Sequence, residues 1–295
     1  SSYEKLREKL IDTVFFDTNL HLGSRTFPEI GGEVVQNTSF TFWKNEVDEK
    51  GIYLRLVDFN SSELKKNKTL EAVSNSQCGF YFNANQKDFE KIPGIPIGYW
   101  SSNKLFEIFE TSKTLEESGL VRQGASTSDN IRFLRYWSEV NFDLIGKDLK
   151  EVSITLKRRE KWFPYNKGGE YRKWWGNQEY VINYGSDGKD LKKFQSNLNQ
   201  GWTARLKSRE YYFKQTISWS KITAGKFSVR FYPNGFIFDV AGCCYFPNGD
   251  ELKILAFLNS KVVSKILQFF SPTLNYEIEH IKKLPELNFY SIKIE

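Results

Sequence analysis

The stretch from Lys157 to Trp175, KRREKWFPYNKGGEYRKWW, constrains this chain more than any other. It holds seven Lys and Arg residues, three Trp, two Tyr and a Gly-Gly pair within nineteen residues. Many proteins bind nucleic acid with cations that contact the phosphate backbone and large aromatic side chains that stack on bases. Glycine lets the main chain approach a ligand closely. The alternative is a solvated loop whose aromatic side chains fold back into a core.

The charge around this stretch favours the nucleic-acid interpretation. Residues 151–230 carry 17 Lys and Arg against 7 Asp and Glu, a net charge of +10, whereas the whole chain carries only +6. Five of the eight Trp residues lie in the same window. A localised basic and aromatic face is typical of proteins that bind nucleic acid. We therefore predict contacts with phosphates and bases in this region.

The composition narrows the class of protein. An apolar fraction of 40% and a charged fraction of 26% are typical of a globular chain, and 295 residues suffice for two ordinary domains. No apolar run approaches the roughly 20 residues that span a bilayer, so we expect no membrane partner. Three Cys, two of them adjacent, do not make a disulfide framework and predict a reducing compartment, the cytoplasm. With two His and no CxxC spacing, no metal site is expected.

Hydrophobic periodicity predicts a chain of mixed helices and strands. Helical spacing is found at residues 3–12, 102–111 and 250–270. Strand patterns are found at residues 13–22, 39–45, 52–58, 78–82, 180–184, 227–231 and 236–240. The polar residues 61–97, with Pro93 and Pro96 near their end, are interpreted as a connector between two parts of the chain.

Motifs for self-contained catalysis are missing. The sequence holds no GxxxxGK[ST] loop, no GxGxxG and no GxSxG. Cys243 and Cys244 lie in the apolar stretch FDVAGCCYF, where buried and inert thiols are expected. We therefore predict no catalytic residue in this chain. The absence of Met and the helical pattern that starts at once in SSYEKLREKL lead us to expect a piece of a longer protein.

Several long blocks resemble one protein family, in the same order along the chain. The blocks are LGSRTFPEIGGEVVQNTSFTF, IYLRLVDF, GLVRQGASTSDNIRFLRYWSEV, KWFPYNKGGEYRKWWGN, WSKITAGKFSVRFYPNGFIFDVAG, LAFLNSKVV and PTLNYEIEHIKKLP. They are similar to segments of BREX-type adenine-specific DNA methyltransferases, the PglX family of phage defence. The last part is also similar to recognition domains of type I restriction specificity subunits.

The resemblance implies an α+β fold in two parts. Residues 1–60 would be the C-terminal strands of a Rossmann-like methyltransferase core. Residues 61–97 would form the connector, and residues 98–295 a target-recognition domain of mixed strands and helices. In GASTSDN, the family pattern leads us to expect a Gly where Ser128 stands.

The resemblance also implies the chemistry of the parent enzyme. That enzyme would transfer a methyl group from S-adenosylmethionine to the exocyclic amine of an adenine flipped out of duplex DNA. The Asn-Pro-Pro-Tyr motif and the Gly-rich cofactor loop are absent from this sequence. We therefore expect the chain by itself to bind no cofactor and to be inactive. Its partners would be double-stranded DNA and its own catalytic domain upstream, with other defence-system subunits as further candidates.

Three groups of residues are candidates for the DNA contacts. Those expected on the phosphate backbone are Arg158, Arg159, Lys161, Lys167, Arg172 and Lys173. Those expected to stack on bases are Trp162, Tyr165, Trp174 and Trp175. Those in a loop expected to face the DNA are Ser126, Thr127, Asp129, Asn130 and Arg132. For this loop the alternative is a helix cap, with Asp129 or Ser128 capping the stretch that begins at Ile131.

A protein-interaction module of a defence complex is the alternative function. Trp-rich surfaces are common at protein interfaces. The two functions differ in their response to salt, because phosphate binding weakens steeply as salt rises and an apolar interface does not.

Overall fold

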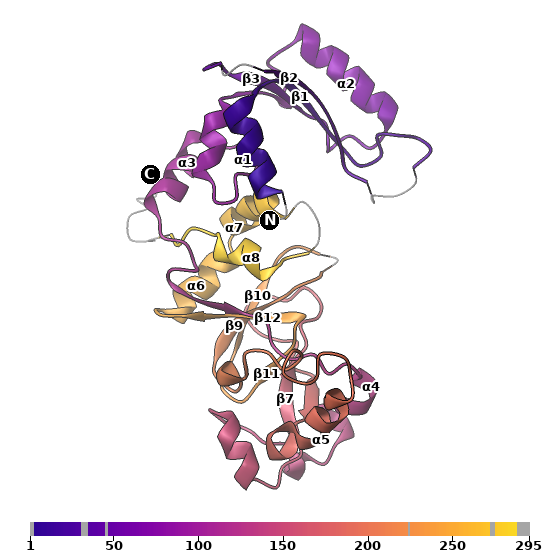
Figure 1. Cartoon of the computed structure of the whole chain (residues 1–295), viewed down its shortest axis with the longest axis vertical. Helices are drawn as coiled ribbons and strands as arrows, with labels where there is room; N and C mark the ends of the chain where they lie inside the picture. Colours follow the sequence, from indigo (N-terminus) through magenta and orange to yellow (C-terminus); the bar gives the residue numbers. More distant parts are fainter. Residues whose placement is uncertain (1–2, 31–34, 45–46, 224, 272–274, 288–295) are drawn as a thin grey trace. The chain divides into compact units, whose positions relative to one another are not determined.

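The computed structural model describes most of the chain. The described residues are 3–30, 35–44, 47–223, 225–271 and 275–287. They form two compact units, residues 1–112 and residues 113–295 (Figure 1). Both units combine helices with small sheets, so the predicted mixture of α and β structure is confirmed. That residues 1–60 end a Rossmann-like core stays a prediction.

The first unit is built on a four-stranded sheet. Its strands are β1 (Phe15–Gly23), β2 (Asn37–Trp43), β3 (Gly51–Arg55) and β4 (Tyr81–Ala84), in the order β2-β1-β3-β4. β1 pairs antiparallel with β2 and parallel with β3, and β4 lies antiparallel to β3. Both faces of β3 are covered, since Tyr53 is fully buried on one face and Leu54 is 4% exposed on the other.

The helices of the first unit include one that the sequence patterns did not predict. The elements are α1 (Glu4–Thr13), α2 (Ser62–Ser74), the 3-10 helix η1 (Gln86–Lys91) and α3 (Asn103–Thr111). The Ser61 hydroxyl caps α2 by accepting from the Leu64 amide at 3.2 Å. Only Lys65 and Ala72 of α2 are buried. A helix with so few buried positions needs no regular apolar spacing, and its sequence shows little.

The boundary between the units differs from the expected connector. Residues 61–97 carry α2, β4 and η1, and β4 completes the sheet of the first unit. The compact units divide between Ser112 and Lys113, directly after α3. The polar composition of residues 61–97 therefore belongs to folded elements with exposed faces.

The second unit contains two four-stranded sheets. The first has the order β10-β9-β12-β5 and is antiparallel throughout. Its strands are β5 (Gly119–Arg122), β9 (Thr216–Ser220), β10 (Val229–Tyr232) and β12 (Gly242–Pro247). The second has the order β11-β7-β8-β6, in which only β11 and β7 are parallel. Its strands are β6 (Leu134–Tyr136), β7 (Trp162–Asn166), β8 (Tyr180–Asn183) and β11 (Ile237–Phe238).

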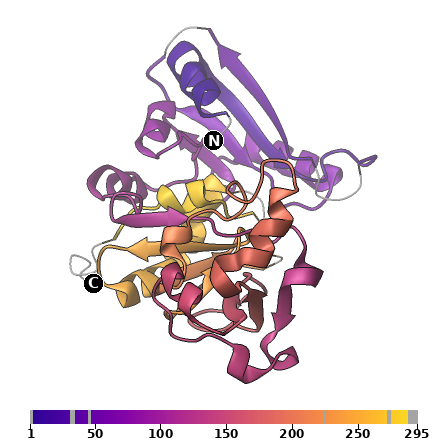
Figure 2. The same ribbon diagram turned by 60° about the horizontal axis from the view of Figure 1, so that its bottom comes forward.

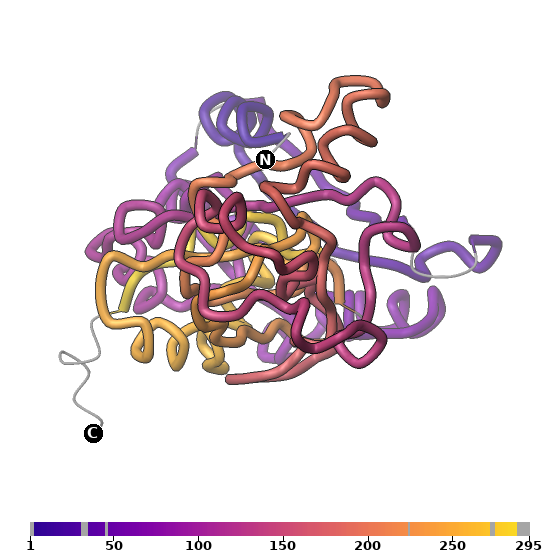
Figure 3. The backbone as a smooth tube through the Cα atoms, turned by 90° about the horizontal axis from the view of Figure 1, so that it is seen from below, coloured from indigo at the N-terminus to yellow at the C-terminus, as the bar shows by residue number. Residues whose placement is uncertain are grey.

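Helices surround these two sheets. The α-helices are α4 (Asn130–Phe133), α5 (Gly185–Ser196), α6 (Glu251–Leu258), α7 (Lys261–Phe270) and α8 (Ile278–Lys282). The 3-10 helices are η2 (Trp137–Glu139), η3 (Phe142–Leu144), η4 (Val152–Lys157) and η5 (Arg209–Tyr211). α6 contacts β9 and β10, and α8 contacts β5, so the C-terminal helices lie on the first sheet (Figure 2). Figure 3 shows the backbone from below, where α5 and the turns that follow it can be traced by their colours from pink to orange.

The single helix predicted at 250–270 is wrong, because the chain breaks there into α6 and α7. Asn259 ends α6, and its side chain pairs with the Val229 main chain through N–Oδ1 at 3.1 Å and Nδ2–O at 3.0 Å. The Ser260 hydroxyl then caps α7 by accepting from the Val263 amide at 3.2 Å. The apolar spacing continues across the break, so periodicity alone does not reveal it.

Two absences hold for the described part of the chain. None of its helices has the length and apolar character needed to cross a membrane. The same residues contain no group of three or more His, Cys, Asp and Glu side chains able to hold a metal ion.

Candidate nucleic-acid interface

The basic and aromatic stretch is divided by a buried strand. β7 occupies residues 162–166, and its Phe163 and Tyr165 side chains are fully buried. Five residues of extended chain span about 17 Å. The cations therefore form two groups at opposite ends of β7. We call residues 157–161 the basic segment and residues 167–177 the Trp loop.

The basic segment keeps several charges in solvent. Arg159 and Lys161 are exposed and form no ion pair with any residue that the structure describes. Arg158 differs, because its guanidinium bonds to the Glu160 carboxylate at 2.5 Å. The main chain is fixed where the segment meets β7, since the Lys161 carbonyl accepts from the amides of Tyr184 and Gly185 at 3.1 and 3.2 Å.

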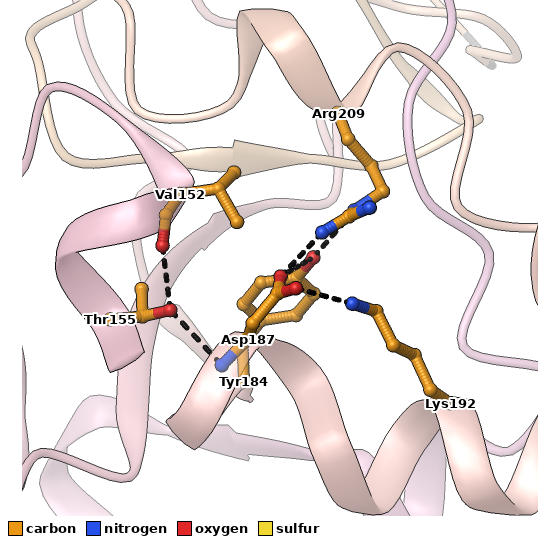
Figure 4. A network of polar contacts seen from close by, with 6 residues as sticks. All are labelled: Val152, Thr155, Tyr184, Asp187, Lys192 and Arg209. Atoms are coloured by element: carbon orange, nitrogen blue, oxygen red, sulfur yellow. Dashed lines mark hydrogen bonds and ion pairs between the residues drawn. The ribbon is translucent and has the colours of Figure 1, made fainter. Parts of the chain in front are cut away.

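An ionic network lies beside the basic segment (Figure 4). The Asp187 carboxylate accepts from Lys192 Nζ and from Arg209 Nη2, both at 2.5 Å, and from the Tyr184 hydroxyl at 3.2 Å. Burial by itself raises the pKa of Asp187, but the two cations outweigh it and hold the pKa below its usual value. Both cations also lie over the Trp202 ring, at 4.8 Å for Lys192 and 5.3 Å for Arg209.

The same network fixes an unusual stretch of backbone. Ser186, Asp187 and Gly188 have φ values of 51°, 56° and 68°, a left-handed turn at the start of α5. This conformation costs roughly 1–2 kcal/mol at each residue other than Gly. The Asp187 amide donates to Thr155 Oγ1 at 3.0 Å, and that hydroxyl donates to the Val152 carbonyl at 2.7 Å. The turn is thereby joined to η4, which leads directly into the basic segment.

The Trp loop is attached to the first sheet through its main chain. The Trp174 amide donates to the Val229 carbonyl at 3.0 Å, and the Phe231 amide donates to the Trp174 carbonyl at 2.9 Å. Lys173 Nζ donates to the Asn259 carbonyl at 2.6 Å. Trp174 has a φ of 73°, which points to backbone strain at this residue. The loop is thus held in one conformation alongside β10.

A fully buried arginine lies beneath the loop. Arg230 Nη1 donates to the Arg172 carbonyl at 3.4 Å, and Nη2 donates to Ser220 Oγ at 3.1 Å. Ser220 Oγ in turn donates to the Gly169 carbonyl at 2.6 Å. Arg230 forms no ion pair with any described carboxylate, and burial lowers the pKa of its guanidinium. The charge is accommodated by carbonyl and hydroxyl dipoles.

Further polar contacts fix the two ends of the loop. The Tyr232 hydroxyl donates to the Asn177 carbonyl at 2.8 Å, and Asn177 Nδ2 donates to the Glu170 carbonyl at 2.9 Å. Gly168 has a φ of 76°, and a Cβ there would lie 2.8 Å from the Ala241 carbonyl oxygen. Only glycine fits this approach without a shift of the main chain.

Four residues predicted to contact DNA are buried or half-buried and bonded within the protein. Tyr165 is fully buried and its hydroxyl donates to Asp239 Oδ2 at 2.6 Å, so it has no surface for stacking on a base. Thr127 is 2% exposed and donates to Asn130 Oδ1 at 2.5 Å. Lys167 lies 3.5 Å from Asp239, half-buried. Lys173 is directed at the Asn259 carbonyl. These four give the weakest support to the predicted interface.

Other predicted residues remain accessible. They are Arg159, Lys161, Arg172, Trp174 and Trp175, all exposed, with Trp162 half-buried beside them in sequence. Arg172 lies 3.7 Å from Glu179, a pair that is open to solvent on both sides. Surface pairs of this kind are weak, so Arg172 is free to exchange its partner for a phosphate.

The predicted loop at 126–132 is in part a helix cap, as the alternative interpretation held. Asp129 Oδ1 accepts from the Arg132 amide at 3.0 Å and caps α4. Ser126 is anchored through its main chain, whose amide donates to the Arg205 carbonyl at 2.8 Å. Ser128 has a φ of 60°, in the left-handed region that Gly adopts without strain, so the expected Gly would fit this backbone. The exposed side chains here are those of Ser128, Asn130, Ile131 and Arg132.

The sequence interpretation missed the residues that anchor these surfaces. Asp187, Arg230 and Asn259 carry no recognisable motif, and each has a partner that lies 22 to 86 residues away along the chain. A charged residue inside the strand pattern SVRFY was the one available signal for Arg230. Cys243 and Cys244 fit the expectation of inert thiols, since both are buried and burial raises the pKa of Cys244 to about 12.

Comparison with known proteins relates the chain to DNA-modifying enzymes. No family model matches it. Over 293 residues it is 41% identical to a protein named adenine-specific methyltransferase PglX from Lacticaseibacillus casei (strain Zhang), covering 97% of this chain and 24% of that protein. The resemblance to PglX proteins is confirmed. Adenine-specific methyltransferase BrxX of Escherichia coli O9:H4 (strain HS) is 39% identical over 294 residues, covering 97% of this chain and 22% of that protein.

These relatives are much longer than the chain, which spans about a quarter of their length. Among solved structures, the type IIL restriction-modification enzyme MmeI, determined in complex with DNA, superposes with a TM-score of 0.53. The match covers 96% of this chain and 37% of MmeI at 10% sequence identity. An identity this low establishes a common fold and nothing more. The chain therefore shares the mixed α/β architecture of a part of MmeI.

Proposed function

We propose that this chain is the DNA-recognition part of an S-adenosylmethionine-dependent methyltransferase that modifies N6 of adenine. The parent enzyme would belong to a phage-defence or restriction-modification system. The names of the PglX and BrxX relatives support the reaction, and the fold shared with a restriction-modification enzyme solved with DNA supports the partner. The observation that carries the proposal is the pair of anchored surfaces, the basic segment and the Trp loop, which hold exposed cations and tryptophans in fixed positions.

The cofactor is assigned to the rest of the parent. A Rossmann-type cofactor site needs a strand that turns through a Gly-rich loop into a helix. Among the described residues of the first unit, β1 is followed by its antiparallel neighbour β2, and β3 leads into α2 through residues 56–61, which contain no Gly. The residues present do not fit S-adenosylmethionine, so this chain contributes recognition and leaves methyl transfer to other parts of the protein.

Each exposed group has a role that follows from its chemistry. Arg159, Lys161 and Arg172 would neutralise phosphates and set the register of the protein on the duplex. Asn130 and Arg132, exposed on α4, would read base edges in the major groove, where amide and guanidinium groups make paired hydrogen bonds. The parent would thus select its DNA sequence with α4 and position itself on the duplex with the basic segment and the Trp loop.

Salt dependence tests this proposal directly. Arg159, Lys161 and Arg172 are replaced together by Ala in the full-length parent, and binding to duplex DNA is measured from 50 to 300 mM salt. The slope of log K against log salt should shrink by about 0.9 for each lost contact, roughly 3 in all. Binding should weaken equally on all sequences.

The matched control removes the same charge from the first unit. Lys66, Lys87 and Lys104 are exposed there, and their joint replacement by Ala should leave the slope unchanged. An equal loss of slope in both variants would mean that net charge causes the effect and that contacts at these three positions do not. An unchanged slope in both would make the basic segment structural and favour the interaction module.

The first unit supplies a specific reason to keep protein partners in view. β2 is an edge strand whose Phe40 and Trp43 side chains are 51% and 63% exposed. Exposed aromatic residues on a sheet edge are unusual in a solitary unit. We assign this strand to contact with the upstream catalytic domain, which is the protein partner expected of a recognition unit. Replacing Phe40 and Trp43 by Ser should lower methylation by the parent without changing the salt slope.

A further inference from the structure

We propose that Trp174 and Trp175 form a stacking wedge that enters duplex DNA at an unstacked base step. This inference rests on the proposed function, and it adds how the DNA is deformed. It concerns the Trp loop alone, because the basic segment offers cations without an exposed, rigid aromatic side chain.

The two indoles are presented to solvent. Trp174 is 52% exposed and Trp175 is 56% exposed. Trp175 is supported from one side by the Phe231 ring, with centroids 6.3 Å apart and an interplanar angle of 26°. Large aromatic side chains gain most by burial, so adjacent exposed tryptophans indicate a surface that is covered in a complex.

The backbone holds Trp174 in a conformation that it would not adopt by itself. Its φ of 73° lies in the left-handed region, and the next glycine, Gly176, has a φ of 125°. Such strain persists only where surrounding contacts fix the chain, and it concentrates at functional sites. Here the contacts are the hydrogen bonds that the Trp174 amide donates to Val229 and that the Trp174 carbonyl accepts from Phe231. A wedge prepared in this way enters a ligand without the entropy loss of ordering a loop.

The surroundings select a nucleobase as the occupant. Arg172 and Tyr171 are exposed in the same loop, and residues 151–230 carry a net charge of +10. A flat aromatic face flanked by a guanidinium matches a base flanked by its phosphate. Proteins that insert apolar side chains between base steps unstack and kink the duplex. Stacking on an aromatic side chain contributes about 1–3 kcal/mol per base, without dependence on sequence.

The test uses the full-length parent and duplexes that report unstacking. Each duplex carries the sequence that the parent methylates, with 2-aminopurine at one position other than the methylated adenine or its partner base. Wild-type protein should brighten 2-aminopurine severalfold at one base step. The double variant Trp174→Ala, Trp175→Ala should lose this signal and bind about tenfold more weakly. Its salt slope should stay that of the wild type, because no phosphate contact is removed.

Two further variants separate a wedge from a structural role. The double variant Trp174→Phe, Trp175→Phe keeps aromatic faces and should recover most of the brightening. Trp137→Ala removes another Trp of the second unit that is 52% exposed and should change neither signal.

The outcomes distinguish this inference from the proposed function. Full brightening by the double Ala variant overturns the wedge while leaving DNA recognition standing. A wild-type parent that does not bind the duplex overturns both. Loss of methylation with unchanged DNA affinity and unchanged brightening assigns the Trp pair to a protein partner, and also overturns the wedge.

Discussion

The two anchored surfaces of the second unit are held by networks of opposite chemistry. Beside the basic segment, Asp187 pairs with Lys192 and Arg209, and these three side chains are 20–28% exposed. Beneath the Trp loop, Arg230 is fully buried and bonds to a carbonyl and a hydroxyl, with no described carboxylate as an ion-pair partner. One network is ionic and reaches the surface, and the other is polar and dry.

This difference predicts different sensitivities. The Asp187 network depends on a group that titrates, and its charges are partly screened by water and salt. Arg230 stays charged at any ordinary pH, so its network does not titrate. Because its guanidinium and the groups around it are cut off from water, any change there leaves donors or acceptors unpaired. Removal of Arg230 should therefore have the larger effect on stability.

The largest effect is expected from Arg230→Ala. Loss of the side chain leaves a cavity, removes the donor to the Arg172 carbonyl, and leaves the Ser220 hydroxyl with its bond to the Gly169 carbonyl alone. We expect about 3 kcal/mol of lost stability and faster proteolysis within residues 167–177. Urea denaturation measures the first and limited trypsin digestion the second. Arg172→Ala, in the same loop but exposed, is the control, with an expected change below about 0.5 kcal/mol. Equal effects of the two variants would remove the distinction between dry and exposed networks.

A smaller effect that depends on pH is expected from Asp187→Asn. Asn tolerates the left-handed backbone, so the change removes charge without adding strain. At pH 7 we expect a loss of about 1–2 kcal/mol. The folded pKa of Asp187 lies below its usual value, so the stabilisation is present above the unfolded pKa of about 4 and is lost as pH falls through the folded pKa.

Unfolding curves at pH 7 and pH 3 measure that difference. The stabilities of wild type and Asp187→Asn should converge at the lower pH. The difference between wild type and Arg230→Ala should stay nearly constant over the same range, which provides the control. A pH-independent effect of Asp187→Asn would mean that its hydrogen bonds matter and its charge does not.

The smallest effect on stability is expected from Trp174→Gly. Glycine relieves the strain of a φ of 73°, but it adds freedom to the unfolded chain, and the two contributions nearly cancel. We expect a change within about 1 kcal/mol of wild type. Thermal unfolding measures it. A loss of several kcal/mol would show that the indole packs as part of the core. Its 52% exposure would then not mean that it is free to stack on a base.

Local patterns revealed more of the fold than of the interface. The predicted helix at 102–111 and strands at 13–22 and 180–184 are found within a few residues of their expected places. α2 was missed because its buried residues are too few to set a period. The break at Asn259 was missed because the apolar spacing continues across it. Both features were missed for the same reason. Contacts with distant parts of the chain decide where a helix forms and where it ends, and a local pattern does not show them.

The candidate site shows the same limit more clearly. Composition located the basic and aromatic stretch, but it did not show that β7 buries Tyr165 and separates the cations into two groups. Nor could it assign Arg230 to the interior. In the strand SVRFY, an arginine between Val229 and Phe231 normally faces solvent, and here the Trp loop covers that face of the sheet. No local pattern reveals which distant loop will cover a strand.

The anchors of the Trp loop have a consequence for how freely the exposed residues of the loop can change. Apart from those of the Lys173 and Asn177 side chains, the hydrogen bonds described above are made to carbonyl and amide groups of the loop, including the Arg172 and Gly169 carbonyls and both main-chain groups of Trp174. Every amino acid except proline offers these same groups. The side chains at positions 172, 174 and 175 can thus be exchanged while the main-chain contacts that hold the loop stay the same. Substitutions at these positions would change the contacts with phosphates and bases and would need no redesign of the support.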